Sequence, residues 1–329
     1  MIRPANSASS GQVVRALALL VALNGRVFAA GSSAPEPADT SPGGLVRAVK
    51  QIEDKLGLHR AGTFEVESNE KAADYRCYYT GKLELPDDYG GLDLKSGSAE
   101  GCQLNSRKYD VFFYPLQAAA SPKAAVTASL AHASPERVLM VIPHEDFHQD
   151  PALAGLPDPL TEAAATLVGF LTARDVARQQ FGAESEVYRN LSKEAELFLG
   201  KSRLVNHYFD TVHQLYADRR AKRVSKEETL AAKDRLFESV EHQCKGMEPK
   251  PASFNRCLAA NNNAGLAFDH TYTLYYPLIY GVARSNGEDL KATIDALKQA
   301  MAGQPAGQAI ENLRLAGRDP VSPAPSDPR

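Results

Sequence analysis

The spacing of apolar residues predicts short strands in the first third of the chain and helices after it. Apolar positions recur at helical spacing from Leu45 to Leu58. Segments rich in β-branched and aromatic residues predict three strands, at 63–67, 75–80 and 108–114. From about residue 118 the pattern is almost wholly helical, with expected helices at 122–133, 135–149, 160–181, 184–199, 202–222, 225–245, 253–284 and 287–302. Asn261 to Gly265 should interrupt the 253–284 segment.

This order of elements predicts an α+β fold that is mainly α. A small mixed α/β part is expected at 45–117 and a larger helical part at 118–318. Functional sites are common where two such parts meet, so a site is expected in the cleft between them.

Both ends of the chain differ in composition from the rest. Residues 1–30 are typical of an export signal, with Arg3 and Arg15, the apolar run ALALLVAL and a small-residue cleavage site at 27–29. That run is too short to span a bilayer. Residues 31–44 read as a flexible linker and 319–329 as a disordered tail. We therefore expect a periplasmic or secreted protein without an integral membrane span.

Four cysteines in an exported chain predict two disulfides. Cys77 with Cys102, and Cys244 with Cys257, would each close a short loop, although three pairings are possible. No CxxC spacing is present, which disfavours a structural zinc cluster.

Charge gives no case for a nucleic-acid partner. The formal net charge is −3, with both signs interspersed. The one basic cluster, at 219–226, is followed by acidic residues, which is typical of a solvated helix.

The pentad His144-Glu145-Asp146-Phe147-His148 is the strongest chemical signal in the sequence. Residues four apart lie on one face of a helix, so the two imidazoles can coordinate one zinc ion, with Glu145 beside it. Pro143 directly precedes the pentad. Either the ligand helix begins near Pro143, or Pro143 kinks a longer helix.

Catalytic zinc sites use three protein ligands, so a third is expected downstream. Glu162 follows His148 by fourteen residues, beyond a Gly/Pro loop and in the first turn of the next helix. Asp150 and Asp158 are rival ligands, but their neighbouring prolines favour turn or capping roles. His207 and His213 are six apart, do not share a helix face, and are expected at the surface or in the core.

Zinc lowers the pKa of a bound water from 15.7 to about 7 and polarises a carbonyl. Glu145 is then the expected general base. A donor to the developing oxyanion is also needed, and the candidates lie in the C-terminal third of the chain.

Several motifs together resemble a bacterial family of gluzincin-type zinc aminopeptidases. The family reads roughly HELAHQ, NESFAT, a basic helix, and NNAxLAxxxTY with a proline five residues later. This chain has HEDFHQ at 144–149, TEAAAT at 161–166, a charged segment at 215–240, NNAGLAFDHTY at 262–272, and Pro277. The likeness covers about residues 135–300, with weaker similarity at 56–58 and 109–114.

The resemblance implies a gluzincin-like metallopeptidase fold with one Zn²⁺, ligands His144, His148 and Glu162, and Glu145 as base. It also marks Asn263 and Tyr272 as matching positions, and we expect Tyr272 to donate to the oxyanion. The motif residues expected as second-layer or substrate contacts are Thr166, Asn263 and His270.

The chain departs from the family pattern at several positions. Thr161 occupies the position where the family usually has Asn, and Ala164 occupies the position where it has Phe. The chain has no Trp. A GxMxN segment that would capture a free amino terminus is also absent. These departures bear on substrate choice more than on metal binding.

The expected function is therefore a zinc peptidase acting on peptides, with aminopeptidase action as one possibility. Two alternatives remain: a zinc hydrolase acting on a non-peptide amide, and a non-catalytic metal-binding or peptide-binding protein that keeps the fold. Glu145 argues against the second alternative, because a pure binding site has no need of a general base.

Overall fold

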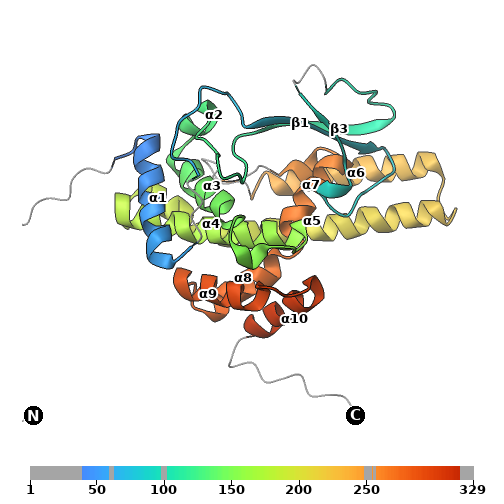
Figure 1. The fold of residues 1–329 in the computed structure, drawn as a ribbon. Helices are drawn as coiled ribbons and strands as arrows, with labels where there is room; N and C mark the ends of the chain where they lie inside the picture. Colours follow the sequence, from blue (N-terminus) through green and yellow to red (C-terminus); the bar gives the residue numbers. More distant parts are fainter. Residues whose placement is uncertain (1–38, 59–62, 98–101, 248–253, 255–256, 319–329) are drawn as a thin grey trace, which may run out of the picture. The chain divides into compact units, whose positions relative to one another are not determined.

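The computed structural model describes residues 39–58, 63–97, 102–247, 254 and 257–318 (Figure 1). These residues belong to one compact unit. The expected signal at 1–30 and tail at 319–329 lie outside the described residues, as does most of the expected linker. Across the described part of the chain, no helix combines the length and the apolar character needed to cross a membrane.

A three-stranded antiparallel sheet forms the β part of the fold. Its strands are β1 (Asp74–Gly81), β2 (Asp93–Ser96) and β3 (Tyr109–Leu116), in the order β2-β1-β3. The predicted strands at 75–80 and 108–114 are confirmed as β1 and β3. The strand β2 was not predicted, because it lies in a loop rich in Gly and Asp. The strand expected at 63–67 is wrong, since Glu67 forms only an isolated bridge with Val126.

The rest of the described chain is mainly helical, which confirms an α+β fold dominated by helices. The longer helices of the N-terminal half are α1 (Pro42–Leu56), α3 (Pro135–Phe147) and α4 (Asp158–Phe181). They are followed by α5 (Glu186–Arg220), α6 (Lys226–Cys244), α7 (Asn263–Thr273), α8 (Tyr276–Ser285), α9 (Leu290–Met301) and α10 (Ala306–Ala316). Three short 3-10 turns complete the elements used below: η1 (Tyr89–Gly91), η3 (Pro151–Leu153) and η4 (Leu258–Ala260).

Several helix boundaries differ from the prediction. The helix expected at 122–133 shrinks to the single turn α2 (Ala128–Ala131), because residues 124–126 are extended and hydrogen-bond to residues 64–68. The two helices expected at 184–199 and 202–222 form one, α5, which runs through Gly200. A glycine inside a helix costs only about 1 kcal/mol, which packing against α4 and α7 can offset. The helix α10 was not predicted.

The helix expected at 253–284 is interrupted at Asn261 and Asn262, within the predicted break, and Asn262 caps α7 by accepting from the backbone of Gly265. Before the break the described residues form only the 3-10 turn η4, so the helix expected there is wrong. A second break, not predicted, separates α7 from α8 just before Pro277. Pro277 has no N–H to donate to the carbonyl of Thr273, four residues earlier, and its ring would clash with that carbonyl, so one continuous helix cannot pass through it without a kink or a break.

Helix α7 lies between the sheet and the helices α4 and α5 (Figure 1). Tyr78 and Phe112 stand side by side on the inner face of the sheet and pack their rings on Phe268 of α7. Alternate residues of a strand share a face, so Arg76 and Tyr114 lie on this face as well. The helix α1, expected in one part with the strands, packs instead on α3 and α4.

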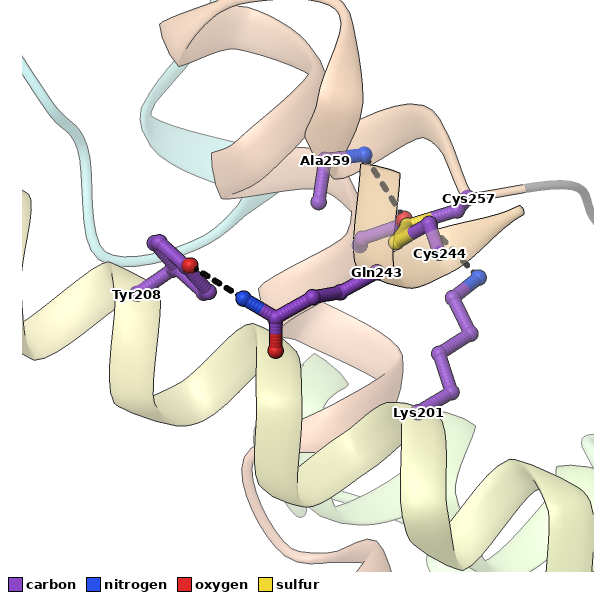
Figure 2. Close-up of a disulfide and its surroundings, with 7 residues drawn as sticks. Lys201, Tyr208, Gln243, Cys244, Cys257 and Ala259 are labelled. Atoms are coloured by element: carbon purple, nitrogen blue, oxygen red, sulfur yellow. Dashed lines mark hydrogen bonds and ion pairs between the residues drawn. A yellow bond between two sulfur atoms is a disulfide. The ribbon is translucent and has the colours of Figure 1, made fainter. Parts of the chain in front are cut away.

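Both expected disulfides are present. Cys77 is bonded to Cys102, and Cys244 to Cys257. The second bond joins the end of α6 to the segment that leads into α7 (Figure 2). Beside it, both the ammonium group of Lys201 and the backbone N–H of Ala259 donate to the buried carboxylate of Asp269.

Candidate metal centre

The pentad lies at the C-terminal end of α3. This helix begins at Pro135 after Ser134, whose side chain caps it, and continues through Pro143 to Phe147. The ligand helix therefore does not begin at Pro143, because Pro143 lies inside it. His144 is buried in the last turn, and His148 caps the helix with helical backbone angles, so both imidazoles emerge on one face.

Glu162 reaches the imidazole pair from α4. This helix begins at Asp158, two residues earlier than expected, which places Glu162 at its fifth position rather than in its first turn. The close approach of α4 to α3 depends on Gly169, because a Cβ atom there would lie 3.2 Å from the Cβ of His144 and 2.9 Å from a backbone oxygen of Met140. Gly169 thus allows α4 to pack close to the end of α3 that carries His144.

The three nearest ligand atoms form a nearly equilateral triangle. His144 Nε2 lies 3.2 Å from Glu162 Oε2, and His148 Nε2 lies 3.1 Å from the same oxygen. The two Nε2 atoms are 3.2 Å apart. A tetrahedral zinc ion with bonds of about 2.0–2.1 Å separates its ligand atoms by roughly 3.3–3.4 Å. Both the donor atoms and their spacing therefore fit a metal ion.

Among the described residues, this trio is the single group of histidines, cysteines and carboxylates that could hold a metal ion. Asp158, the first residue of α4, stands outside it. Asp150 caps the 3-10 turn η3 and pairs with Lys298 at 2.7 Å. His207 and His213 are exposed on α5, in agreement with the sequence analysis.

Charge coupling within the trio is strong. Burial alone would lower the pKa of His148, but the carboxylate of Glu162 outweighs it and raises that pKa to about 9. Burial would raise the pKa of Glu162, yet His148 and His144 hold it well below its usual range. Glu162 is therefore a carboxylate at any ordinary pH, as a metal ligand must be.

Glu145 lines the same cavity as the three ligands, and so does Tyr272 of α7. The cavity has a volume of about 280 Å³. Burial raises the pKa of Glu145, although His144 and His148 act in the opposite direction. The ring of Tyr272 lies 6.3 Å from that of His144, nearly parallel to it. Burial, followed by the charge of Glu162, raises the pKa of Tyr272, so its hydroxyl stays protonated.

Tyr89 is a site residue that the sequence analysis missed. Its hydroxyl donates to Glu162 Oε1 at 3.1 Å, on the carboxylate oxygen that does not face the imidazoles. Burial and then the charge of Glu162 raise the pKa of Tyr89, so the phenol remains a donor. Hydrogen bonds of this kind orient a ligand carboxylate and are worth 10- to 100-fold in metal affinity.

Helix α7 holds the loop that carries Tyr89. His270 donates from Nδ1 to the backbone carbonyl of Asp87 at 2.7 Å, and Thr271 accepts from the backbone N–H of Tyr89 at 2.8 Å. Burial lowers the pKa of His270 and favours its neutral ring, although the bond to Asp87 acts in the opposite direction. His270 thus affects the candidate metal ligands only indirectly, by holding the loop that carries Tyr89.

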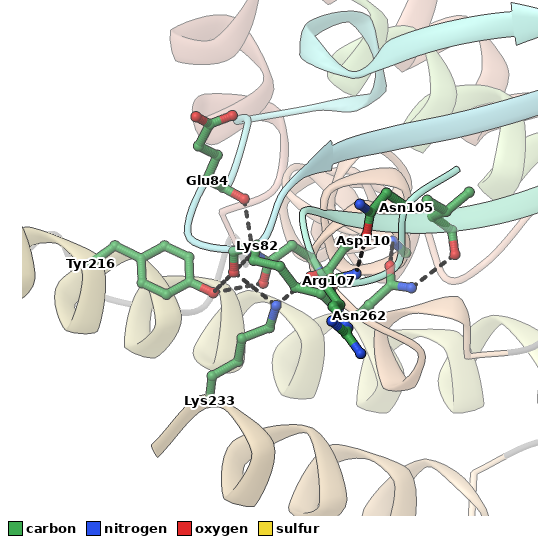
Figure 3. Close-up of polar contacts among 11 residues, drawn as sticks. Lys82, Glu84, Asn105, Arg107, Asp110, Tyr216, Lys233 and Asn262 are labelled. Atoms are coloured by element: carbon green, nitrogen blue, oxygen red, sulfur yellow. Dashed lines mark hydrogen bonds and ion pairs between the residues drawn. The ribbon is translucent and has the colours of Figure 1, made fainter. Parts of the chain in front are cut away.

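Asn263 is the first residue of α7 and bonds to the start of the same loop. Its partners Lys82, Glu84 and Tyr216 are labelled in Figure 3. Its amide donates to the backbone carbonyls of Lys82 and Glu84 at 3.2 and 2.8 Å, and its oxygen accepts from Tyr216 at 2.9 Å. The nearby Asp110 pairs with Lys82 and with the buried Lys233. The structure therefore brings Tyr272, but not Asn263, into the cavity.

Thr166 lies one turn after Glu162 on α4 and is fully buried. In the part of the chain that the structure describes, its hydroxyl and the Nδ1 atom of His144 have no hydrogen-bond partner. The His144 ring is instead held by packing, with the rings of Phe254 and Tyr272 against it.

Comparisons of the chain with protein-family models, with curated proteins and with solved structures gave no match.

Proposed function

We propose that this protein is a zinc-dependent peptidase, and the converging atoms of His144, His148 and Glu162 are the observation that carries the proposal. Two imidazoles and one carboxylate are a typical ligand set for catalytic zinc, which leaves its fourth position open. A bound zinc ion supplies Lewis-acid activation of water and of a substrate carbonyl.

The chain's own residues supply the remaining chemistry. Glu145 lies in the cavity beside the ligands, where its carboxylate can accept a proton from water and pass it to the leaving amine. Tyr272 lines the same cavity with a protonated hydroxyl, suited to donate to the carbonyl oxygen as negative charge develops on it. Tyr89 keeps the Glu162 carboxylate oriented.

The test compares the parent protein with Glu145→Gln, on metal content and on cleavage of a mixed peptide library. We expect near-stoichiometric zinc in both proteins by mass spectrometry. Turnover should fall by about 100-fold or more in the variant, because the general base is gone. The exposed His207→Ala on α5 is the matched control and should retain both zinc and turnover.

Other outcomes favour the alternatives. Zinc without cleavage of any peptide would favour a binding protein, and cleavage of non-peptide amides alone would favour an amidohydrolase. The peptide products also decide the mode of action. Single residues released from the amino end support an aminopeptidase, and internal cuts refute that assignment.

We further propose that the protein is exported to the periplasm or secreted. Its two disulfides support this, because such bonds persist in oxidising compartments. Amino-terminal sequencing of the mature protein from fractionated cells tests the proposal. The chain should begin near residue 30, and a cytoplasmic protein that retains its first residues would contradict it.

A further inference from the structure

The strand β1 brings one cation to the metal cavity. Arg76 lies opposite Tyr114 of β3, on the face of the sheet whose rings pack against α7. It is the single lysine or arginine among the described residues that line the cavity. The same cavity contains Glu145 and the three candidate ligands. Arg76 therefore lines the same open cavity as the groups proposed to cleave the substrate.

The guanidinium of Arg76 is held in place but has donors to spare. Its Nε donates to Asp74 at 2.9 Å, and its Nη1 donates to the hydroxyl of Tyr78 at 3.1 Å. An arginine offers five N–H donors, so these two bonds to described residues leave three for a ligand. About a third of the side chain is exposed. This combination of fixed orientation and spare donors is suited to bidentate recognition of a carboxylate.

Asp74, which pairs with Arg76 at 2.9 Å, is not among the residues that line the cavity. Asp74 offsets much of the charge of Arg76, so the attraction for a substrate carboxylate comes from the N–H donors that Asp74 and Tyr78 leave unused.

The size of the cavity limits how far this group can be from the bond that is cleaved. Its volume of about 280 Å³ is at the lower end of the roughly 300–1,000 Å³ found for small-molecule sites. An extended peptide advances about 3.3–3.6 Å per residue. A group bound at Arg76 therefore belongs to a residue next to the cleaved bond or one further along.

We propose that Arg76 binds a carboxylate of the substrate, so that the enzyme prefers peptides with a carboxylate within about two residues of the cleaved bond. This inference rests on the proposed peptidase function. The carboxylate can be the carboxyl terminus of a short peptide or the side chain of Asp or Glu. Both sources present the same planar pair of oxygens to the guanidinium.

A binding experiment on the zinc-loaded protein tests this without requiring turnover. The probes are two dipeptide hydroxamates, which chelate zinc at one end and carry either a free carboxylate or a carboxamide at the other. Calorimetry should show the carboxylate probe binding about 10- to 100-fold more tightly, as expected for a charged hydrogen-bonded pair. Arg76→Met should reduce that ratio to about one, and Arg76→Lys should leave an intermediate ratio, because lysine keeps the charge but not the fork.

Lys95→Met is the matched control. Lys95 is exposed on β2 and pairs with Cys77, so it lies on the opposite face of the same sheet from Arg76. A general effect of protein charge would appear in both variants, whereas a contact with the ligand would appear only at Arg76. Zinc content and thermal unfolding are measured for each protein. If Arg76→Met does not fold, the parent, Arg76→Lys and Lys95→Met still decide the matter.

A second pair of probes separates the two sources of the carboxylate. One carries a glutamate side chain with an amidated carboxyl terminus, and the other carries glutamine with a free carboxyl terminus. The probe whose advantage depends on Arg76 identifies the group that is recognised.

Equal binding of both carboxylate and carboxamide probes by the parent, or the same preference in the parent and in Arg76→Met, overturns the proposal. Arg76 would then serve only to order Asp74 and Tyr78. Binding of neither hydroxamate by the zinc-loaded protein overturns it as well. Peptide cleavage that is independent of Arg76 would leave the peptidase function standing while this inference fails.

Discussion

Tyr89 donates a hydrogen bond to Glu162, a residue 73 positions later in the chain, at 3.1 Å. The bond joins a short loop beside the sheet to the ligand helix α4. It leaves the other oxygen of Glu162 within 3.2 Å of both imidazoles. The orientation of the third candidate ligand is thus set by a residue that belongs to none of the sequence motifs.

Replacing Tyr89 with phenylalanine should weaken metal binding by about 10- to 100-fold, because the Glu162 carboxylate loses its orienting partner. Competition with a chromophoric chelator measures the change. Tyr79→Phe is the control, since Tyr79 lies on β1 and contacts Tyr109 away from the cavity. Unchanged metal affinity in Tyr89→Phe would show that packing alone holds Glu162 in position.

Removing the metal should destabilise the fold. A ligand present at about 1,000 times its dissociation constant adds roughly 4 kcal/mol to the free energy of unfolding. For a chain of this size that corresponds to a rise of roughly 8–16 °C in Tm. Thermal unfolding with zinc and with excess chelator measures the difference. Glu162→Gln should respond little to the chelator, and an identical Tm for the parent in both conditions would refute metal binding.

Glu53 should make stability depend on pH. It is fully buried on α1, 3.4 Å from Lys50, and burial, with Asp146 next, raises its pKa from 4.5 to about 8. A raised pKa in the folded state means that the folded protein holds a proton that the unfolded chain releases. The resulting stability is complete below about pH 4.5 and is lost as the pH rises through about 8.

Glu53→Gln removes this titration while keeping the shape of the side chain. Its free energy of unfolding, relative to the parent, should rise between pH 5 and pH 8 by more than about 1 kcal/mol, since one pKa unit corresponds to about 1.4 kcal/mol. Urea unfolding at several pH values measures this. The exposed Glu65→Gln should follow the parent at every pH. Parallel curves for the parent and Glu53→Gln would contradict the prediction.

The disulfide between Cys244 and Cys257 should stabilise the fold by about 3 kcal/mol, because it closes a loop of 13 residues in the unfolded chain. Urea unfolding of the double Ser variant measures the loss. Reductant should lower the unfolding midpoint of the parent further than that of the variant, which keeps only the bond from Cys77 to Cys102. Equal responses to reductant would indicate that the second bond adds nothing.

The sequence alone identified the helices that carry the candidate metal group. The pentad spacing places two imidazoles on one helix face. The Gly/Pro loop before α4 predicts that the chain turns back, so that the next helix can bring a carboxylate to the first. These are local properties, decided by spacing and turn residues. The disulfide pairings, favoured because each closes a short loop, were predictable for the same reason.

Residues that act across long stretches of chain could not be found in this way. Tyr89 and Arg76 lie in segments with no pattern of catalytic residues, and they reach the cavity only because the sheet packs on α7. An aromatic residue in the Gly-rich loop at 85–91 was the one available signal for Tyr89. Asn263 shows the opposite case, since it belongs to a motif yet bonds to a distant loop.

Hydrophobic periodicity and turn chemistry therefore determined the helical elements, the two main strands and the order of the candidate ligands. Tertiary packing decided which short segments became strands. It also made α5 one continuous helix through Gly200, where the sequence predicted two helices. It also decided which side chains surround the cavity. The physical reason is the distance along the chain over which each signal acts. Hydrophobic periodicity depends on neighbours within one element. The cavity is lined by residues of β1, η1, β3, α3, α4 and α7, and these elements come into contact only when the chain is folded.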